Sequence, residues 1–346
     1  MNVASRFLGE GVRPDFDQAP LTVAWEITRS CPLRCVHCRA VAQVRRDPDE
    51  LSIDEGTALI ADAADMGTKV FVLTGGDPLA RPDVFDLIEA VEASGMHCGF
   101  SPSTTPRLTA DALGRAVDAG AGTIHLSLDG ASAATHDAFR GVRGSFERAM
   151  SGVGYAAELD ARLQVGTTVC RRTVGDLEAI VPLLEGRVDL WSLFFLVPTG
   201  RGRNEDVLDA QGHEEILEWL ATADLPVPVR TVAAPTFRRV LAEAGRPAAP
   251  GVNDGNGFAF VSHRGEVCPS GFLQLPVGTV REQPLSHWYR DDPLFRSLRD
   301  TALLEGTCGA CEWKEICGGS RARAWATTGN PLAADPSCIR VADSAA

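Results

Sequence analysis

The sequence predicts an α/β fold, in which parallel strands alternate with helices, followed by a smaller cysteine-rich region. Between residue 21 and about residue 235, short apolar runs typical of buried strands alternate with longer segments of helical periodicity. Six strands separated by helices favour parallel pairing through right-handed crossovers. Near residue 235 the alternation stops, and from Gly251 the chain becomes glycine-rich and irregular, with several cysteines.

The first half of the alternation begins with a strand over residues 21–28. Ser52 and Glu55 form an S-x-x-E capping box, which predicts a helix from about 53 to 66. Residues 69–74 (KVFVLT) form a buried strand that a Gly-Gly pair ends. The next expected elements are a helix at about 82–94, a strand near 97–102 and a helix at about 109–119.

The second half of the alternation follows the same rhythm. In order, the expected elements are a strand at 123–128 (TIHLSL), a helix at about 145–159, a strand at 163–170, a further helix and a strand at 189–197. After the alternation, residues 258–267 are typical of a short hairpin. So short a region buries little apolar surface, and an inorganic group held by its cysteines would explain how it keeps its shape.

Composition excludes several classes of partner. The chain has 346 residues with 33 Lys plus Arg and 46 Asp plus Glu, giving a formal net charge of −13. This balance argues against a nucleic-acid partner, because phosphate binding needs a basic face. No apolar run reaches the roughly 18 residues of a membrane span, and the first 20 residues lack a signal peptide's apolar core. We therefore expect a cytoplasmic protein that binds neither nucleic acid nor membrane.

Seven of the ten cysteines fall into two spaced groups, which favours metal or cluster binding over disulfides in a reducing compartment. Cys31, Cys35 and Cys38 form C-x3-C-x2-C directly after the first strand. Three thiolates on one loop can hold three irons of a [4Fe–4S] cube and leave the fourth iron open to a small molecule. Zinc, or unrelated buried cysteines, is the alternative, although structural zinc usually takes four protein ligands.

Three motifs in order then resemble the radical S-adenosylmethionine (SAM) superfamily. They are residues 31–38 (CPLRCVHC), residues 74–78 (TGGDP) after the second strand and residues 127–130 (SLDG) after the fourth. The resemblance implies a partial (β/α)6 barrel whose ligands collect at the carboxyl ends of the strands. It also implies reductive cleavage of SAM to a 5′-deoxyadenosyl radical that abstracts hydrogen, with an electron donor of the flavodoxin or ferredoxin type.

The resemblance further assigns SAM-binding residues. Gly75 and Gly76 would let the backbone approach the methionine end of SAM, where a Cβ atom would clash. Asp77 stands where relatives often carry Glu and is expected, with the carbonyls of its loop, to accept hydrogen bonds from the SAM ammonium group. His37 occupies the place of an aromatic residue near adenine, which Val197 and its neighbours would flank.

Four polar residues complete the expected SAM contacts. Ser103, Ser127 and Asp129 lie at strand ends from which they would reach the ribose or methionine moiety, and Arg140 would make a two-point contact with the SAM carboxylate. Each has a purely structural alternative. Ser127 or Asp129 would then cap helices, and Arg140 would form a surface ion pair.

The second cysteine group, Cys308, Cys311 and Cys317 followed by Cys338, resembles the C-terminal half of a SPASM domain, which carries auxiliary clusters. Gln283 and Arg321 stand where that domain has further cysteines. We therefore expect one auxiliary [4Fe–4S] cluster, fully ligated by the four thiolates, and two clusters in the whole chain. Structural zinc is the alternative.

The three remaining cysteines have no assigned ligand role. Cys268 fits the opening of a SPASM domain, yet we expect it not to bind a cluster. Cys98 and Cys170 lie in apolar strands and are expected to fill the core. The resulting division is an N-terminal extension (1–20), a radical SAM partial barrel (21–235), a SPASM/twitch-like domain (236–340) and a tail (341–346).

Residues 21–340 resemble SPASM-type radical SAM proteins of haem pathways, of the sirohaem decarboxylase type. Those proteins remove carboxylate-derived side chains from sirohaem-derived or related tetrapyrroles. This implies hydrogen abstraction from a small carboxylated metabolite, such as a tetrapyrrole or a sugar nucleoside, with loss of CO2. The expected carboxylate partners, alternatively a solvated basic surface, are Arg201, Arg203, Arg321 and Arg323. Two other functions stay open: a maturase of a ribosomal peptide, and a non-enzymatic iron–sulfur or zinc module.

Overall fold

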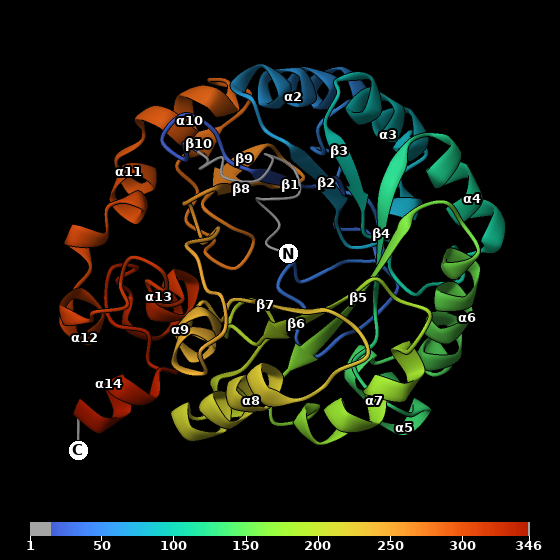
Figure 1. Ribbon diagram of the computed structural model, residues 1–346. Coiled ribbons are helices and arrows are strands. Elements are labelled where there is room, and N and C mark those ends of the chain that lie inside the picture. The colour runs from blue at the N-terminus through green and yellow to red at the C-terminus, as the bar shows by residue number, and fades with distance from the viewer. Residues whose placement is uncertain (1–14, 345–346) are drawn as a thin grey trace.

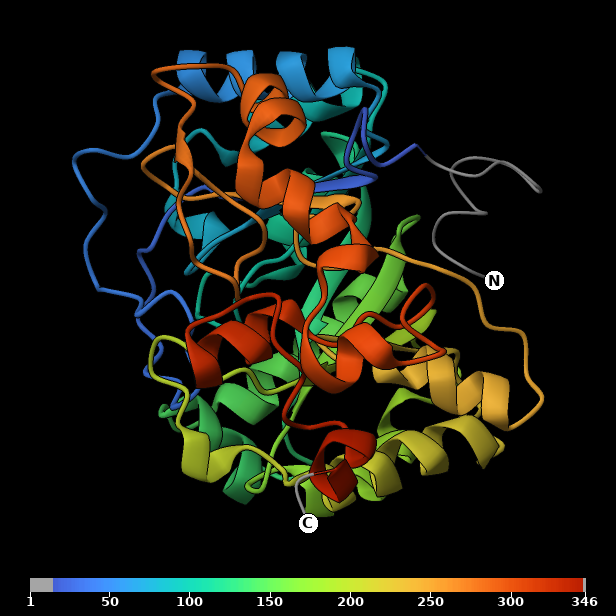
Figure 2. The ribbon, with the colours of Figure 1, turned by 90° about the vertical axis from the view of Figure 1, so that its left-hand side faces the viewer.

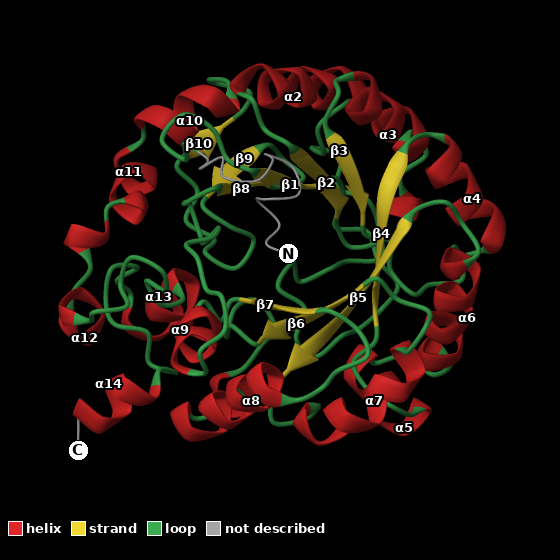
Figure 3. Ribbon diagram, in the orientation of Figure 1, coloured by secondary structure: helices red, strands yellow, loops and turns green. Residues whose placement is uncertain are grey.

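The computed structural model describes residues 15–344. A single curved sheet of ten strands has the order β10-β9-β8-β1-β2-β3-β4-β5-β6-β7. From β8 to β7 every pairing is parallel, whereas β9 and β10 pair antiparallel. The sheet forms an incomplete ring with helices outside and loops in its centre (Figures 1 and 3). The predicted α/β fold with parallel strands is confirmed.

The strands are short, as expected for a parallel barrel-like sheet. Their bounds are β1 Thr22–Glu26, β2 Val70–Thr74, β3 His97–Phe100, β4 Ala121–Ser127, β5 Arg162–Val169, β6 Leu190–Phe195, β7 Val229–Val232, β8 Phe258–Val261, β9 Glu266–Cys268 and β10 Gly278–Thr279. Each of the six strands that the sequence predicts before residue 200 overlaps one of β1–β6.

The helices fall into two groups. Those that cover the outside of the ring are α2 Ile53–Met66, α3 Val84–Ala93, α4 Ala110–Asp118, α5 Ala133–Arg140, α6 Ser145–Ala157, α7 Leu177–Leu184 and α8 Ala210–Thr222. The later ones are α9 Thr236–Glu243, α10 Leu285–Asp291, α11 Pro293–Arg299, α12 Gly306–Ala310, α13 Arg321–Thr328 and α14 Ile339–Ser344. Figure 2 shows this later group across the open side of the ring.

Helix α2 shows how local sequence sets an element. The Ser52 hydroxyl accepts a hydrogen bond from the Glu55 N–H, and the Glu55 carboxylate accepts one from the Ser52 N–H. This is the predicted capping box, which satisfies two N–H groups that the first turn leaves unpaired. Gly67 ends the helix in the left-handed conformation, so both predicted bounds are confirmed.

Residues on each strand alternate between two environments. The outward-facing ones, among them Trp25, Phe71, Leu126 and Trp191, are buried in one apolar core together with the helices. Because neighbouring side chains in a strand point to opposite faces, the residues between them line the concave face of the sheet. This face holds glycine, polar and charged residues, which the site below uses.

The predicted hairpin at 258–267 is present as β8 and β9, and it joins the main sheet. Strand β8 pairs with β1 from Thr22 opposite Phe258 onward. A buried carboxylate reinforces this junction: Glu26 accepts hydrogen bonds from Arg29 and Arg39, both at 2.8 Å, and lies 3.3 Å from the His263 ring of the hairpin.

Several elements were not predicted. Helix α5, strand β7 and the helices α10–α13 are too short, with too few apolar residues, to stand out in the sequence. Residues 341–344, placed in a tail by the sequence, lie in the last helix. Most of the expected N-terminal extension (residues 1–14) lies outside the described residues. None of the helices within residues 15–344 has the length and hydropathy needed to cross a bilayer.

Candidate active site

The loop after β1 brings the first three cysteines together. Cys31, Cys35 and Cys38 share one small apolar cluster with Leu33 and Val142. The loop is anchored at both ends, because Cys31 N–H donates to the Gln43 carbonyl at 2.8 Å and Cys38 N–H donates to the Cys35 carbonyl. The predicted three-thiol loop therefore lies at the carboxyl end of a parallel strand, where α/β sheets bind ligands.

Each of the three sulfur atoms has a hydrogen-bond donor nearby. The Arg140 guanidinium lies 3.8 Å from Cys35 Sγ, and the Ala42 N–H lies 3.5 Å from Cys38 Sγ. The Ser103 hydroxyl and a backbone N–H face Cys31. Donors aimed at sulfur stabilise thiolate over thiol, and the thiolate is the form that binds metal.

Burial acts in the opposite direction. It raises the pKa of Cys31 to about 11 and also raises the pKa of Cys35, where Arg140 only partly offsets it. Two buried thiols with raised pKa values, and a third thiol on the same loop, all with donors near their sulfur atoms, fit a cationic metal centre that supplies the missing positive charge. The donor set therefore suits the cluster expected from the sequence.

The Gly-Gly turn after β2 packs directly on this loop. A Cβ atom at Gly75 would lie 2.5 Å from the Thr28 carbonyl oxygen, and one at Gly76 would lie 2.7 Å from the carbonyl oxygens of Arg29 and Ser30. The close approach that requires glycine is thus to the chain's own backbone just before the first cysteine. This differs from the expectation that a ligand occupies that space.

The carboxylate of the same turn, that of Asp77, already accepts hydrogen bonds from other residues of the chain. Asp77 is fully buried, and its carboxylate accepts hydrogen bonds from the Thr105 hydroxyl at 2.7 Å and the Leu79 N–H at 3.3 Å. Burial raises the pKa of Asp77 despite these donors. Ser103 donates to the Gly76 carbonyl at 2.5 Å, so this carbonyl and hydroxyl lie together beside Cys31.

Asp129 and Arg140 form a buried ion pair rather than the exposed one considered above. The Thr168 N–H donates to the other Asp129 oxygen at 2.7 Å. Although burial raises the pKa of Asp129, Arg140 outweighs it and holds that pKa below its usual value. Arg140 therefore bridges Asp129 and Cys35, and its guanidinium has little capacity left for a two-point contact with a free carboxylate.

The residues expected near adenine have apolar surroundings. The His37 ring stacks on Phe139, with centroids 4.2 Å apart and planes 9° apart. Burial lowers the pKa of His37 to about 3, so the ring is neutral, and its buried Nδ1 has no hydrogen-bond partner. Val197 is buried beside Leu273 in a second apolar cluster. Ser127 ends β4, half-buried on the concave face.

The four candidate carboxylate-binding arginines differ sharply. Arg201 has two buried guanidinium nitrogens, Nε and one Nη, without a partner, and its backbone N–H donates to the Cys38 carbonyl at 3.0 Å. Arg203 is exposed and pairs with Glu205. Arg321 and Arg323 are almost fully buried inside the C-terminal region. Of the four, Arg201 alone has unpartnered donors next to the first cysteine loop.

The two C-terminal arginines hold their own segment together. Arg321 donates to the carbonyls of Gly319, Pro331 and Ala333, and lies 3.8 Å from Cys308 Sγ. Arg323 pairs with the fully buried Asp335. Arg321 thus places a cation against the Cys308 sulfur. It does so at the position where a SPASM domain has a further cysteine.

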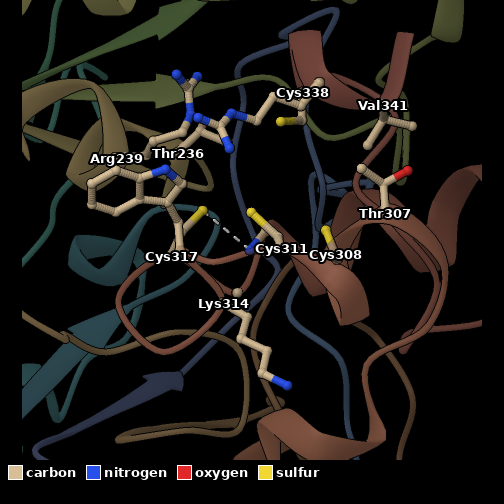
Figure 4. Close-up of a pocket in the computed structure, with 13 residues that line it drawn as sticks. Thr236, Arg239, Thr307, Cys308, Cys311, Lys314, Cys317, Cys338 and Val341 are labelled. Carbon is tan, nitrogen blue, oxygen red and sulfur yellow. Dashed lines mark hydrogen bonds between the residues drawn. The ribbon is translucent and has the colours of Figure 1, made fainter. Parts of the chain in front are cut away.

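The second cysteine group surrounds a pocket. Cys308, Cys311, Cys317 and Cys338 all line it, and it holds about 380 Å³ of space including its opening. Figure 4 shows the four sulfur atoms around a common space between α12, the following loop and the start of α14. The four predicted ligands of the auxiliary site are therefore brought together.

Donors and cations again face these sulfurs. The Asp335 N–H lies 3.4 Å from Cys308 Sγ, and the Gly319 N–H lies 3.4 Å from Cys317 Sγ. Burial raises the pKa of Cys317 to about 12 and raises that of Cys338. Across residues 15–344, no three His, Cys, Asp or Glu side chains converge tightly enough to ligate a single metal ion.

The remaining cysteines lie apart from both groups. Cys268 is in a small cluster with Ala24 and Phe260 on the concave face near β1. Cys98 belongs to the main apolar core, and Cys170 packs with Phe139 and Leu196. Cys98 and Cys170 thus fill core space, as expected.

Sequence reasoning missed the charged residues in the middle of the concave face, among them His125, Arg162 and Arg230. The sequence does carry a signal for them, namely strict alternation of polar and apolar residues. In residues 123–127 (TIHLS), Thr123, His125 and Ser127 alternate with apolar residues, and residues 162–165 (RLQV) begin the same pattern with Arg162. Such alternation marks the face of a strand that is not packed against helices.

Comparison with known proteins gives matches that extend over most of the chain. The model of the radical SAM superfamily matches residues 25–181. The AdoMet-dependent heme synthase of Nitratidesulfovibrio vulgaris is 38% identical over 91% of each chain. The Fe-coproporphyrin III synthase of Methanosarcina barkeri is 32% identical, and its match covers 93% of this chain and 88% of the relative. Streptococcus suis SuiB bound to S-adenosylmethionine has the same fold, with a TM-score of 0.72 at 16% identity, covering 93% of this chain and 77% of SuiB.

Proposed function

This chain belongs to the radical SAM superfamily, and from that premise we propose that it removes a hydrogen atom from a carboxylated tetrapyrrole. The observation that carries the proposal is the loop after β1, which gathers three thiols, two of them buried, with a donor near each sulfur. Members of the superfamily are enzymes that use a [4Fe–4S] cluster and SAM. This excludes the third function left open above, a non-enzymatic module.

Cys31, Cys35 and Cys38 would hold the cluster. When bound and reduced, it supplies the electron that splits SAM, whose nucleoside fragment then takes the hydrogen atom from the substrate. The protein's own part is electrostatic. Arg140 favours the thiolate form of Cys35 against the effect of burial, and Asp129 keeps the Arg140 guanidinium in place from the far side.

The expected SAM contacts are Gly75, Gly76, Asp77, Ser103, Ser127, Asp129, Arg140 and His37. The geometry supports a change in one role. Arg140 is already paired with Asp129, whereas Arg201 has two unpartnered guanidinium nitrogens beside the same loop. We therefore propose Arg201 as the partner of the SAM carboxylate. Two charge-assisted hydrogen bonds from one guanidinium suit a carboxylate.

The substrate class rests on the relatives. A heme synthase aligned over 91% of both chains supports a tetrapyrrole, since a match of that length leaves little of either chain outside the shared architecture. The outcome we propose is oxidative decarboxylation of a carboxylated side chain. Once the hydrogen atom is removed, the bond to the carboxylate breaks, CO2 leaves as a C=C bond forms, and the remaining electron passes to a one-electron acceptor, a role that the oxidised form of the redox partner proposed below would fill. A peptide substrate, the second candidate, has no observation in this structure in its favour.

Cys308, Cys311, Cys317 and Cys338 would hold a second [4Fe–4S] cluster. A cube carries its four thiolates on four separate irons, so they stand farther apart than the ligands of one zinc ion. Four thiols spread around a pocket, with no tight single-ion site, support the cube over zinc. Two cubes require about eight irons per chain, and one cube with zinc requires about four.

The electron donor we propose is of the flavodoxin or ferredoxin type. Val41 and Val44 lie on the loop after Cys38 with 53% and 76% of their surface exposed. Apolar side chains this exposed are typical of a contact surface. Their loop is also the exposed chain segment that directly follows the first cluster's ligands.

The test is anaerobic incubation of the reduced protein with SAM and iron coproporphyrin III. Wild type and the core variant Cys98→Ala should release 5′-deoxyadenosine and yield a porphyrin lighter by CO2 and two hydrogen atoms for each side chain converted, whereas Cys35→Ala should do neither. If 5′-deoxyadenosine were released but neither iron coproporphyrin III nor any other porphyrin tested were changed, the proposal of a tetrapyrrole substrate would be refuted. A peptide-encoding gene beside this one would then direct the search to the second candidate.

A further inference from the structure

Three charged or titratable side chains lie together on the concave face, away from both cysteine groups. Arg162 begins β5, Arg230 lies in β7, and His125 lies in β4. The charge of Arg230 acts on both of the others. No role in cluster or SAM binding has been given to any of them. We call this group the cationic recess.

Arg230 has only neutral hydrogen-bond partners in the described part of the chain. Its Nε donates to the Ser192 hydroxyl at 2.9 Å, and one Nη donates to the Gln164 side-chain carbonyl at 3.2 Å. Burial, with repulsion from Arg162, lowers the pKa of Arg230 to about 10. The guanidinium is still charged at neutral pH, so the recess holds two neighbouring positive charges.

The other two members have buried donors or acceptors without partners. Arg162 Nε and His125 Nε2 are both buried with no hydrogen bond. Burial lowers the pKa of His125 to about 4, which leaves a neutral ring that can donate one hydrogen bond. Buried polar atoms in native proteins are nearly always paired, so these atoms point to a missing partner.

The sheet places the members of the recess on neighbouring strands. Ser127, Gly166, Ser192 and Arg230 form one row of paired residues across β4, β5, β6 and β7. A Cβ atom at Gly166 would lie 2.5 Å from His125 Nε2 and 3.1 Å from the Phe194 ring. The absence of a side chain at Gly166 therefore makes room for the His125 ring, which lies over β5 with its unpartnered nitrogen.

We propose that the cationic recess binds a carboxylate of the substrate, with Arg162 and Arg230 as its charge partners and His125 as a further donor. An anion would satisfy the unpartnered nitrogens and neutralise two like charges that have no acidic partner. The row of paired residues from Ser127 to Arg230 places this anion on the same concave face as the strand end at Ser127. The proposal deepens the proposed function and rests on it for the identity of the substrate.

The test uses Arg230→Met and Arg162→Met in the anaerobically prepared holoprotein, with Arg187→Met as the matched control. Arg187 is exposed and precedes β6. Binding of iron coproporphyrin III is followed by absorbance, and the melting temperature is measured with and without citrate. We expect each recess variant to bind the porphyrin about 10- to 100-fold more weakly than wild type, because charge-assisted bonds are lost.

The melting temperature provides a readout that does not need the substrate. Removing an unpaired, partly buried charge should leave the ligand-free melting temperature unchanged or raise it, whereas a purely structural arginine would lower it. Citrate, a tricarboxylate, should stabilise wild type and the Arg187→Met control more than either recess variant.

The outcomes separate this proposal from the function on which it rests. If the porphyrin binds wild type and both variants equally, the recess is not a carboxylate site, while the tetrapyrrole assignment stands. If the porphyrin binds none of them but citrate stabilises only wild type and the control, the recess stands and the tetrapyrrole is wrong. A lower melting temperature in both variants without any change in ligand response would overturn the recess.

Discussion

Replacement of Gly76 by alanine tests how the turn after β2 supports the first cysteine loop. The added Cβ atom would lie 2.7 Å from two carbonyl oxygens, those of Arg29 and Ser30. These atoms belong to backbone just before Cys31, so they cannot rotate away as a side chain would. The turn and the loop are also joined by two hydrogen bonds of 2.7 Å, Gly76 N–H to Thr28 and Asp77 N–H to Ser30.

The magnitude follows from these contacts. Inserting a methyl group into a packed site costs about 1 to 3 kcal/mol. Displacing the turn weakens two hydrogen bonds, each worth about 1 kcal/mol. Together the variant should lose about 2 to 5 kcal/mol of stability, or roughly 4 to 10 °C in melting temperature. SAM cleavage should fall as well, because the same shift moves the segment that carries Cys31.

The matched control is Gly154→Ala in α6. Gly154 is exposed in the helix, and a Cβ atom there meets nothing within 4 Å. The same substitution should stabilise the protein by about 0.5 to 1 kcal/mol, since alanine favours a helix over glycine. Denaturation of both variants under anaerobic conditions measures the difference. A Gly76→Ala variant as stable and as active as wild type would refute the packing argument.

Three further predictions concern buried charges. Asp129→Asn should cost about 3 to 5 kcal/mol by chemical denaturation, because it leaves Arg140 as an unpaired buried cation. For Glu26, burial raises the pKa, yet Arg39 and its neighbours outweigh this and hold it below 4.5. Its stabilising effect should therefore be complete above about pH 4.5 and fade as the pH falls, so wild type and Glu26→Gln should converge in stability in acid. Arg321→Met should cost roughly 3 kcal/mol, one for each carbonyl left without its donor, and should lower the iron content at Cys308.

Each of these predictions has a result that contradicts it. The control for Asp129→Asn is Glu205→Gln, in the exposed pair with Arg203, which should change stability by less than about 1 kcal/mol. If Asp129→Asn lost no more stability than this control, burial of the Asp129–Arg140 pair would be unimportant. A stability difference for Glu26→Gln that grows in acid would reverse the assigned sign. Normal iron content in Arg321→Met would separate that arginine from the second cluster.

The two cysteine groups share a device that neither spacing nor composition reveals. In each, a buried arginine lies 3.8 Å from one cysteine sulfur: Arg140 beside Cys35 and Arg321 beside Cys308. Both guanidinium groups are fixed from behind, Arg140 by Asp129 and Arg321 by backbone carbonyls. A positive charge held in this way favours thiolate ligands in a buried site.

The local parts of the fold could be predicted from the sequence. The capping box at Ser52 located the start of α2, and apolar runs located β1–β6, because both signals depend on residues close in the chain. The parallel pairing of β8 with β1 joins residues more than 230 positions apart, and no local pattern encodes it. Helix α5 was missed because its sequence, AATHDAFR, is short and its buried face includes a histidine and an arginine, so it has few apolar residues.

The site was predictable to the same extent. Motif spacing identified Cys31 and its two partners, and the structure brings them together. The partner of Arg140 could not be read from the sequence, since Asp129 reaches it only through the turn between β4 and α5. The unpartnered guanidinium nitrogens of Arg201 and Arg162 are likewise a property of packing.

The most direct test of the central claim is the electron paramagnetic resonance spectrum of the dithionite-reduced protein, recorded with and without SAM. A cluster held by Cys31, Cys35 and Cys38, with one iron open, should give a signal that changes when SAM binds. That response should persist when Cys308 and Cys338 are replaced by alanine and vanish when Cys35 is replaced. A cluster signal that SAM leaves unchanged in the wild-type protein would contradict the account.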